Sequence, residues 1–268
     1  MRVLVDGHED GAINPADRGF NYGDGLFETL AVRNGQARFV DWHLERLATG
    51  AARLGIPLPD AVLLKDEVAR ACPGDRGVVR VVLTRGSGPR DYRPPREPRP
   101  LRVVSGSPWP ERDPACWTEG VRLRWCETRL GRNPRLAGIK HLNRLEQVLA
   151  RAEWAGDEVA EGLMMDEGGN VIGGTRTNLF AIFEDGLATP ALDQCGVAGV
   201  MRCAFRRWAA GQGIAIAERR LPAEELAGAR GLLLTNSLIG AWPVRALAER
   251  VFDLDPRVAA FNAWLERR

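Results

Sequence analysis

The chain has 268 residues with 45% apolar and 27% charged side chains, the composition of a soluble globular protein large enough to enclose a site. Its 37 Lys plus Arg against 35 Asp plus Glu leave a net charge of +2, so no overall field attracts nucleic acid or a membrane surface. No apolar run is long enough to span a bilayer. The five cysteines lack CxxC spacing and the three histidines lack ligand-like spacing, so we expect no disulfide framework, no metal site and a cytoplasmic location.

The first part of the chain predicts a strand-rich domain with two helices. An Asn34-Gly35 turn, the strongest short hairpin signal, joins strand-like stretches over Gly25–Val32 and Gln36–Val40. Leucines at helical spacing then mark a helix that ends at Gly55 and Pro57. The remaining elements are strands over residues 2–5, 77–86 and 101–107, a second helix over 60–72, and an irregular Arg-, Gly- and Pro-rich loop over 85–100.

Three prolines in SPWPERDPACW make residues 109–116 the predicted linker between a small N-terminal domain, 1–108, and a larger C-terminal domain, 117–268. The second domain predicts strands around the turns at 167–169 and 185–186, a helix over 199–211 and a short amphipathic helix at the end. There is no regular strand–helix–strand alternation and no internal repeat. The pattern therefore favours an α+β fold.

Lys140 stands out because only it and Lys65 are lysine among the 37 basic residues. Arginine stays protonated at any working pH, whereas a lysine amine can lose its proton, attack a carbonyl and form an imine. The apolar run Leu136–Ile139 and the positive end of a following helix both act to lower its pKa from about 10.4. The sequence therefore indicates a reactive lysine.

A plainer interpretation of Lys140 stands beside this one. Lys65 is followed by Asp66 and Glu67 and reads as an ordinary charge on a helix face. Lys140 is equally readable as a surface lysine at the start of a helix. The predicted apolar face of that helix is Leu142, Leu145, Leu149 and Ala152.

Three places have the chemistry of a phosphate site, and each also has an ordinary interpretation. Gly199 directly precedes a predicted helix, so the following amides either meet an anion at the positive helix end or simply enter the helix from a loop. Thr235–Ser237 end an apolar strand and either line a pocket or form a tight turn. Arg46 is a phosphate cation or a solvated helix charge. The RGSGPR run is neither a Walker loop nor GxGxxG, so nucleotide binding is not favoured.

Five stretches of the chain occur together in a recognisable order. They are LGRNPRLAGIKHLNRLEQVLARAEW, DRGFNYGDGLFETL, VVLTRGSGPRDY, DQCGVAGVMR and a strand that ends in TNS. In this order and spacing they resemble the 4-amino-4-deoxychorismate lyases, which are fold-type IV pyridoxal-phosphate enzymes related to branched-chain and D-amino-acid aminotransferases. The resemblance covers about residues 1 to 250, and its GIKHLNRLEQVLAR run is the part specific to the lyases.

The resemblance implies a fold-type IV homodimer, with pyridoxal 5'-phosphate between the small and the larger domain of each chain. It also implies conversion of 4-amino-4-deoxychorismate to 4-aminobenzoate and pyruvate, a step of folate biosynthesis. Lys140 is implied as the catalytic residue that bonds the cofactor covalently. The residues implied on the cofactor are Lys140, Arg46, Gly173, Gly199, Val200, Met201, Asn236 and Ser237, and those implied on the substrate are Thr29, Arg90 and Tyr92.

One position departs from the family pattern. Five residues before Asn178 the family has a glutamate that bonds the pyridine nitrogen of the cofactor, and this chain has Gly173. The departure keeps two alternatives open. One is a fold-type IV aminotransferase acting on branched-chain or D-amino acids, and the other is a catalytically weakened homologue that still binds the cofactor.

Overall fold

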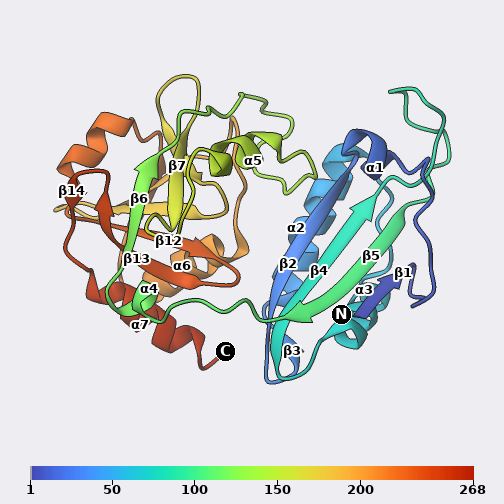
Figure 1. Cartoon of the computed structure of the whole chain (residues 1–268), viewed down its shortest axis with the longest axis horizontal. Helices are drawn as coiled ribbons and strands as arrows, with labels where there is room; N and C mark the ends of the chain where they lie inside the picture. The colour runs from blue at the N-terminus through green and yellow to red at the C-terminus, as the bar shows by residue number, and fades with distance from the viewer. Residues whose placement is uncertain (1) are drawn as a thin grey trace. The chain divides into compact units, whose positions relative to one another are not determined.

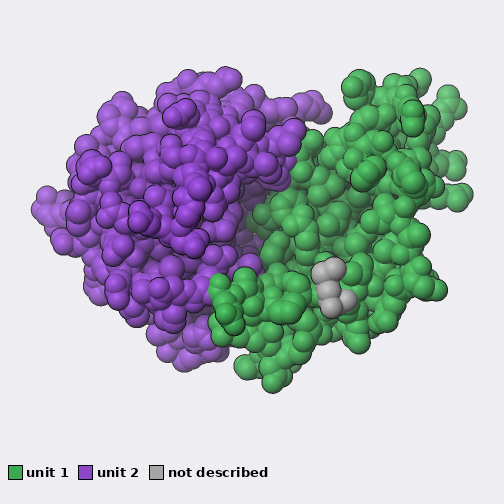
Figure 2. All heavy atoms as spheres, in the orientation of Figure 1, with its two compact units in different colours: residues 1–111, 139–143 green, residues 112–138, 144–268 purple. Residues whose placement is uncertain are grey.

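The computed structural model describes residues 2–268, which Figure 1 traces along the chain. The chain divides into two compact units, coloured separately in Figure 2. Unit 1 comprises residues 1–111 together with Ile139–Asn143, and unit 2 comprises Arg112–Gly138 together with Arg144–Arg268. The short segment that carries Lys140 therefore belongs to a different unit from the residues on both sides of it.

Unit 1 is built on one antiparallel sheet. Its strands are β1 (Arg2–Val5), β2 (Gly25–Arg33), β3 (Gln36–Ala37), β4 (Arg76–Thr84) and β5 (Leu101–Pro108), and its helices are α1 (Arg18–Tyr22), α2 (Val40–Leu54) and α3 (Ala61–Ala71). The strand order is β1-β5-β4-β2-β3. β2 pairs with β4 over its whole length, from Gly25 opposite Thr84 to Arg33 opposite Arg76.

The helix boundaries in unit 1 follow the predicted stop and start signals. α2 ends at Gly55, whose left-handed φ of 63° lets its amide bond back to the last turn. α3 begins after Asp60, whose carboxylate accepts the Val62 amide at 2.6 Å. The predictions of these two helices are confirmed.

Two features near the first hairpin differ from the sequence prediction. The strand expected over Gln36–Val40 ends at Ala37, because Phe39 takes a left-handed φ of 55° and Val40 already begins α2. A short helix, α1, was not expected. It forms because the Asp17 carboxylate accepts the Phe20 amide at 3.1 Å and caps its first turn.

Unit 2 contains a mixed nine-stranded sheet, so the predicted α+β class is confirmed. Its strands are β6 (Val121–Trp125), β7 (Glu161–Met165), β8 (Val171–Gly174), β9 (Asn178–Ile182), β10 (Leu187–Pro190), β11 (Ile216–Arg219), β12 (Gly231–Asn236), β13 (Gly240–Leu247) and β14 (Arg250–Val251). Its α-helices are α4 (Ala115–Thr118), α5 (Leu145–Ala152), α6 (Val200–Gly211) and α7 (Pro256–Leu265), and a 3-10 helix spans Ala223–Gly228. The order is β11-β10-β9-β12-β13-β6-β7-β8, with β14 on β13.

Aromatic packing fixes α6 against the sheet of unit 2. The ring of Phe205 on α6 lies 4.6 Å from Phe180 on β9 and 5.1 Å from Phe261 on α7, measured between centroids. All three side chains are fully buried, and each burial contributes on the order of 1.5 to 3 kcal/mol. This packing determines where the N-terminus of α6 lies.

The helix after Lys140 is shorter than predicted. α5 begins at Leu145, and the positive charge of a helix end acts most strongly within the first turn. Lys140 lies before that turn, so this effect on it is weaker than predicted. The apolar face of α5 is not buried in the chain, because Leu145, Val148 and Leu149 are 76%, 59% and 60% exposed and Ala150 is the residue that is buried. We call these three exposed residues the α5 stripe.

All five cysteines are free thiols, and Cys126 and Cys195 are buried. Burial raises the pKa of Cys126 to about 12 and that of Cys195 to about 11, so both are unreactive as nucleophiles at neutral pH. Among residues 2–268, no helix is both long and apolar enough to cross a bilayer.

Candidate active site

Lys140 lies on a short segment that pairs with the beginning of β2. The Phe27 amide donates to the Lys140 carbonyl at 3.0 Å, and the Leu142 amide donates to the Gly25 carbonyl at 2.9 Å. Asn143 continues the contact, since its Nδ2 donates to the Gly23 carbonyl at 3.2 Å. These bonds lie at Lys140 and on its C-terminal side, so they fix the lysine backbone relative to β2.

The ring of Phe27 lies beside two cations. Lys140 Nζ and the Arg80 guanidinium carbon are each 4.3 Å from its centroid. Thr29 is two residues further along β2, on the same strand face as Phe27, and it lies opposite Arg80 in the sheet. This face of unit 1 therefore gathers Lys140, Thr29 and Arg80, of which the sequence analysis had not identified Arg80.

Arg46 on α2 is held by a buried carboxylate. Glu28, which is 1% exposed, accepts bonds from Arg46 Nε at 2.8 Å and from Arg46 Nη2 at 2.5 Å. It also accepts a bond from His43 Nδ1 at 2.6 Å. Two parallel bonds between a guanidinium and a carboxylate are a strong, orienting arrangement. The Arg46 side chain is 13% exposed, so it is not the solvated helix charge that the sequence also allowed.

The charges around Glu28 decide its protonation. Burial alone would raise the pKa of Glu28, but the charge of Arg46 and the hydrogen bonds from His43 and Arg46 lower it to about 2. Burial lowers the pKa of His43, and the positive charges of Arg46 and Lys140 add to that effect against the raising influence of Glu28. His43 is therefore a neutral donor to an ionised Glu28, and Lys140 belongs to the same electrostatic cluster.

In unit 2, the beginning of α6 has the geometry of an anion site. Gly199 is the residue before the helix, and no side chain among the described residues caps the amides of the first turn, which include Val200 and Met201. A Cβ at position 199 would lie 2.1 Å from Asn178 Oδ1, so only glycine fits where Asn178 packs against this turn. Asn178 is fixed there because its Nδ2 donates to the Val197 carbonyl at 2.8 Å.

The end of β12, next to α6, carries a buried hydroxyl group that is not used in a hydrogen bond within residues 2–268. Thr235 lies opposite Asn178 in the pairing of β12 with β9, and it is fully buried. Within residues 2–268 its hydroxyl has no hydrogen-bond partner. The Asn236 side chain is used by the turn instead, since its Oδ1 accepts the amides of Leu238 and Ile239 at 2.9 and 3.0 Å. For Asn236 the geometry is that of the tight turn.

Gly173 lies on β8, where a side chain would collide with the backbone. Its φ is 158°, and a Cβ built on it would lie 2.6 Å from the Thr177 carbonyl oxygen. Real Cβ atoms are not found that close to a carbonyl oxygen. A glutamate at this position would therefore require the turn between β8 and β9 to move.

A buried carboxylate organises that same turn. Glu161, at the start of β7, is fully buried, and its Oε1 accepts the Thr175 hydroxyl at 2.5 Å and the Thr175 amide at 3.1 Å. Its Oε2 accepts the Arg176 amide and the Thr177 hydroxyl, both at 3.3 Å. The sequence shows this residue as a charge at the head of the apolar run EGLMM, a signal that the sequence analysis did not use.

Arg90 and Tyr92 lie on the β4–β5 loop, residues 85–100, which is irregular as predicted. Both side chains are exposed, Tyr92 by 83%. The ring of Tyr92 lies 5.5 Å from the ring of Tyr22 at the end of α1. Of the residues predicted for the site, unit 1 contains Thr29, Arg46, Arg90, Tyr92 and Lys140, and unit 2 contains Gly173, Gly199, Val200, Met201, Asn236 and Ser237.

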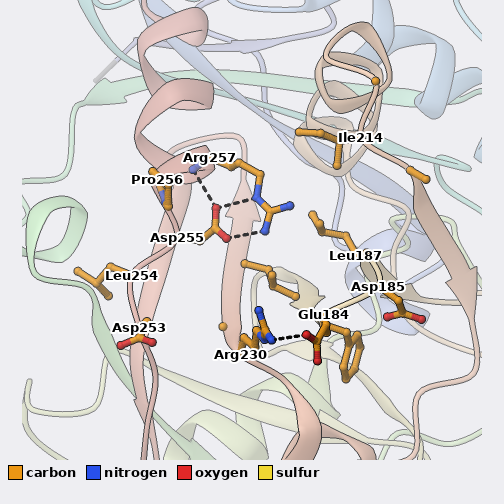
Figure 3. A pocket seen from close by; sticks show the side chains of 16 residues that line it. Glu184, Asp185, Leu187, Ile214, Arg230, Asp253, Leu254, Asp255, Pro256 and Arg257 are labelled. Atoms are coloured by element: carbon orange, nitrogen blue, oxygen red, sulfur yellow. Dashed lines mark hydrogen bonds and ion pairs between the residues drawn. The ribbon is translucent and has the colours of Figure 1, made fainter.

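A separate pocket of about 620 Å³ lies in unit 2 (Figure 3). Its charged side chains pair with one another, Arg230 with Glu184 at 2.7 Å and Arg257 with Asp255 at 2.5 Å. Asp255 also caps α7. None of the residues predicted for the site lines this pocket, whose walls are residues 182–187, 213–215, 230–231 and 253–257.

Comparison with known proteins relates the chain to one family. Residues 25–247 match the model of amino-transferase class IV. An aminodeoxychorismate lyase of Vibrio harveyi is 36% identical over 233 residues, which are 87% of this chain and 86% of that protein. A putative branched-chain-amino-acid aminotransferase of Methanocaldococcus jannaschii is 29% identical, covering 96% of this chain and 89% of that protein.

A solved structure gives a closer likeness. The crystal structure of 4-amino-4-deoxychorismate lyase from Pseudomonas aeruginosa superposes with a TM-score of 0.94 and is 47% identical, covering 99% of this chain and 98% of that chain. At this coverage the match includes residues of both units.

Proposed function

We infer, from the fact that this chain belongs to the amino-transferase class IV family, that it is a pyridoxal-phosphate lyase converting 4-amino-4-deoxychorismate to 4-aminobenzoate and pyruvate. Identities of 36% and 47% to two such lyases, against 29% to the aminotransferase relative, support the lyase reaction. The product, 4-aminobenzoate, is a precursor of folate.

The residues present fit a cofactor that carries a phosphate and an aldehyde. Val200 and Met201 offer uncapped amides at a positive helix end, and Thr235 offers a buried hydroxyl without a partner among the described residues. We propose that these groups, with Ser237 and Asn236 at the strand end and Arg46 from α2, bind the phosphate. Lys140 is the residue proposed to bond the aldehyde carbon. When bound, pyridoxal phosphate supplies a sink for the electrons left on a substrate carbon.

Lys140 is proposed to move the proton in the reaction. Its neutral Nζ takes the proton from C4 of the substrate and delivers it to the ether oxygen as the bond from C3 to that oxygen breaks. The ring becomes aromatic as 4-aminobenzoate, and the enol form of pyruvate leaves and tautomerises. Arginine cannot replace this lysine, because a guanidinium stays protonated.

Arg90, Tyr92 and Thr29 are proposed to bind the substrate, which carries carboxylates. A guanidinium forms charge-assisted bonds to carboxylates, and the two hydroxyl groups add neutral ones. Arg80 lies opposite Thr29 in the sheet, and we add it to this set.

The observation that carries the proposal is the position of Lys140. Its backbone bonds to β2 and its amine lies over Phe27, near His43, although it is one of only two lysines in the chain. The test is a coupled assay in which the purified protein receives 4-amino-4-deoxychorismate and the appearance of 4-aminobenzoate is followed. Absence of product from protein that retains bound pyridoxal phosphate would overturn the lyase assignment.

An aminotransferase is the second candidate, because that activity occurs in the same family. Incubation with an amino acid and a keto acid distinguishes an aminotransferase from a lyase, because an aminotransferase converts the cofactor to its pyridoxamine form. With Gly173 in place of a carboxylate, we expect this conversion to be nearly absent.

We also propose a homodimer in the cytoplasm. The α5 stripe, Leu145, Val148 and Leu149, is an exposed apolar surface at helical spacing, which favours burial against another chain. Light scattering should give a mass of twice 29.4 kDa. Leu149→Asp should shift the mass towards the monomer, while Val251→Asp, at a residue 76% exposed on β14, should not.

A further inference from the structure

We propose that Arg18 is a positioning residue that holds the β4–β5 loop and thereby places Arg90 and Tyr92. Its effect on the substrate rests on the function proposed above, while its effect on the loop does not. Nothing in the sequence resemblance assigns a role to Arg18, although it lies in the DRGFNYGDGLFETL stretch that carries part of that resemblance.

Arg18 reaches the loop with both ends of its guanidinium. Nη1 donates to the Asp91 carbonyl at 2.6 Å and Nη2 donates to the Tyr92 carbonyl at 3.0 Å. The guanidinium carbon also lies 5.0 Å from the centroid of the Tyr22 ring, which in turn contacts the ring of Tyr92. Arg18 is 3% exposed, so these bonds are shielded from competing water.

A shared carboxylate keeps Arg18 in this orientation. Asp24 Oδ2 accepts Arg18 Nε at 2.8 Å and Arg85 Nε at 2.7 Å, and Asp24 Oδ1 accepts Arg85 Nη2 at 2.9 Å. Arg85 is itself fixed to the end of α2, through the Leu54 and Gly55 carbonyls, both at 2.8 Å. The Arg18 guanidinium is therefore held in one orientation by Asp24, which is itself linked through Arg85 to the end of α2.

The rest of the loop has few attachments. At its base, a Cβ on Gly86 would lie 1.8 Å from the Arg99 carbonyl, so the two arms of the loop touch there. Gly88 is bonded to the Ala16 carbonyl at 3.3 Å. Within residues 2–268, the two bonds from Arg18 are the hydrogen bonds that tie residues 89–98 to the rest of the molecule. Removing Arg18 should therefore release the tip and leave the base closed.

The same short segment that carries Arg18 also carries the contacts to Lys140. Gly23, Gly25 and Phe27 bond to the Lys140 segment, and Arg18 and Asp24 bond to the loop side. Two stretches of sequence that are far apart, DRGFNYGDGLFETL and VVLTRGSGPRDY, thus form one framework. The loop tip and Lys140 are therefore both hydrogen-bonded to the same short stretch of the chain, residues 18–27.

The direct test is limited trypsin digestion of the full-length protein, without substrate. Apart from the buried Arg85 at its base, the loop contains two bonds that trypsin can cut, Arg90–Asp91 and Arg96–Glu97, since Arg93 and Arg99 precede proline. Two hydrogen bonds contribute about 1 kcal/mol each, so Arg18→Ala should speed cleavage at these bonds by roughly ten-fold or more. Arg18→Lys keeps the charge but not the two parallel donors, and it should give an intermediate rate.

Arg102→Ala is the matched control. Arg102 is another largely buried arginine of unit 1, and within residues 2–268 its side-chain bonds go to Glu67, at 3.0 Å, and Asp6 rather than to residues 89–98. If Arg102→Ala raises cleavage in the loop as much as the Arg18 variants do, the effect is general destabilisation and the proposal is wrong. Should Arg18→Ala fail to fold, Arg18→Lys decides the question by the same comparison.

Kinetics then test the effect on the substrate. Arg18→Ala should raise KM for 4-amino-4-deoxychorismate by roughly ten-fold, with kcat within about two-fold and cofactor retention unchanged. A fall in kcat at unchanged KM would overturn the positioning role. If the wild-type protein makes no 4-aminobenzoate, the proposed function fails, and the trypsin result still decides whether Arg18 holds the loop.

Discussion

The Phe27 amide donates to the Lys140 carbonyl at 3.0 Å, while the Lys140 amine lies 4.3 Å from the ring of the same phenylalanine. One residue of β2 therefore fixes the backbone of Lys140 and provides the surface on which its side chain rests. A lysine held in this way has a restricted set of rotamers, which favours a single reacting position.

Lys140→Ala should abolish both covalent cofactor binding and the lyase reaction. Lys140→Arg should be equally inactive, because it supplies charge without a proton that can be transferred. The measurements are the visible absorbance of the purified protein, and mass spectrometry after borohydride, which should add the cofactor to the peptide that contains Lys140.

Lys65→Ala is the control for these variants. Lys65 is about half exposed and pairs with Asp41 on the surface, at 2.5 Å, so its removal should change neither absorbance nor rate. A fully active Lys140→Ala protein would end the proposed mechanism.

Arg46→Ala should weaken cofactor binding more than it slows turnover at saturating cofactor. A charge-assisted bond to phosphate contributes about 1.5 to 3 kcal/mol, or roughly ten- to a hundred-fold in affinity. The variant also leaves Glu28 without its main counter-charge, so its free energy of unfolding should fall. Equilibrium dialysis at a temperature where circular dichroism shows folded protein separates the two effects.

Arg70→Ala is a suitable comparison for Arg46→Ala, because Arg70 is an exposed arginine on α3. If dialysis removes cofactor at the same rate from the Arg46 variant, the Arg70 variant and the wild type, Arg46 has no part in phosphate binding.

The Glu28 cluster predicts a loss of stability in acid. The pKa of Glu28 is lowered to about 2 in the folded chain from an ordinary value of 4.5, so its contribution is complete above pH 4.5 and is lost as pH falls towards 2. A shift of this size corresponds to roughly 3 kcal/mol. Because pH 3 still lies above the lowered pKa, urea unfolding of the wild type should show a loss of roughly 2 kcal/mol between pH 6 and pH 3.

Glu28→Gln should remove most of that pH dependence and should also lower stability at pH 6. The change leaves Arg46 without its paired carboxylate and gives His43 a different partner, both in a buried place, which typically costs about 3 to 5 kcal/mol. A variant that loses stability between pH 6 and pH 3 as steeply as the wild type would show that other groups cause the acid effect.

Two substitutions at Gly173 separate backbone strain from charge. Gly173→Ala and Gly173→Glu both add the Cβ that lies 2.6 Å from the Thr177 carbonyl, so both should lower the free energy of unfolding, by about 1 to 3 kcal/mol. Among these two, the glutamate variant should have the faster lyase reaction, by roughly ten- to a hundred-fold, if its carboxylate reaches the pyridine nitrogen.

Equal rates for the two variants would mean either that another group already bonds the nitrogen or that residue 173 does not correspond to the family glutamate. Thr175 is the neighbouring candidate, and its hydroxyl already donates to Glu161 at 2.5 Å. Gly169→Ala is the control for strain alone, because Gly169 has a left-handed φ of 76° and open space around it.

The sequence predicted most of the elements, because their signals are local. The Asn34-Gly35 turn, the Gly55 stop and the Asp60 cap each act within a few residues, and the structure has each of them. The strand expected to continue to Val40 was wrong because the backbone of Phe39 turns left-handed, which nothing in the composition of that run indicates.

The site was harder to predict because its contacts join distant positions. Glu28 interrupts an apolar strand and so carried a signal, but its partners on α2 become apparent only in three dimensions. The apolar spacing in α5 was read correctly, yet the periodicity cannot say whether a stripe faces the core of its own chain. The domain limits at 108 and 117 and the residue roles on the cofactor stay predictions.

The assignment of Ile139–Asn143 to unit 1 has a consequence for biosynthesis. As the chain leaves the ribosome, residues 1–111 emerge first. The hydrogen bonds of Gly25 and Phe27 to this segment cannot form until residues 139–143 have also emerged. Unit 1 is then completed only after the first strand of unit 2 and the turns behind it have been synthesised. A fragment ending at residue 111 should accordingly fold less stably than the same residues do in the full chain, with an unfinished edge where Lys140 belongs.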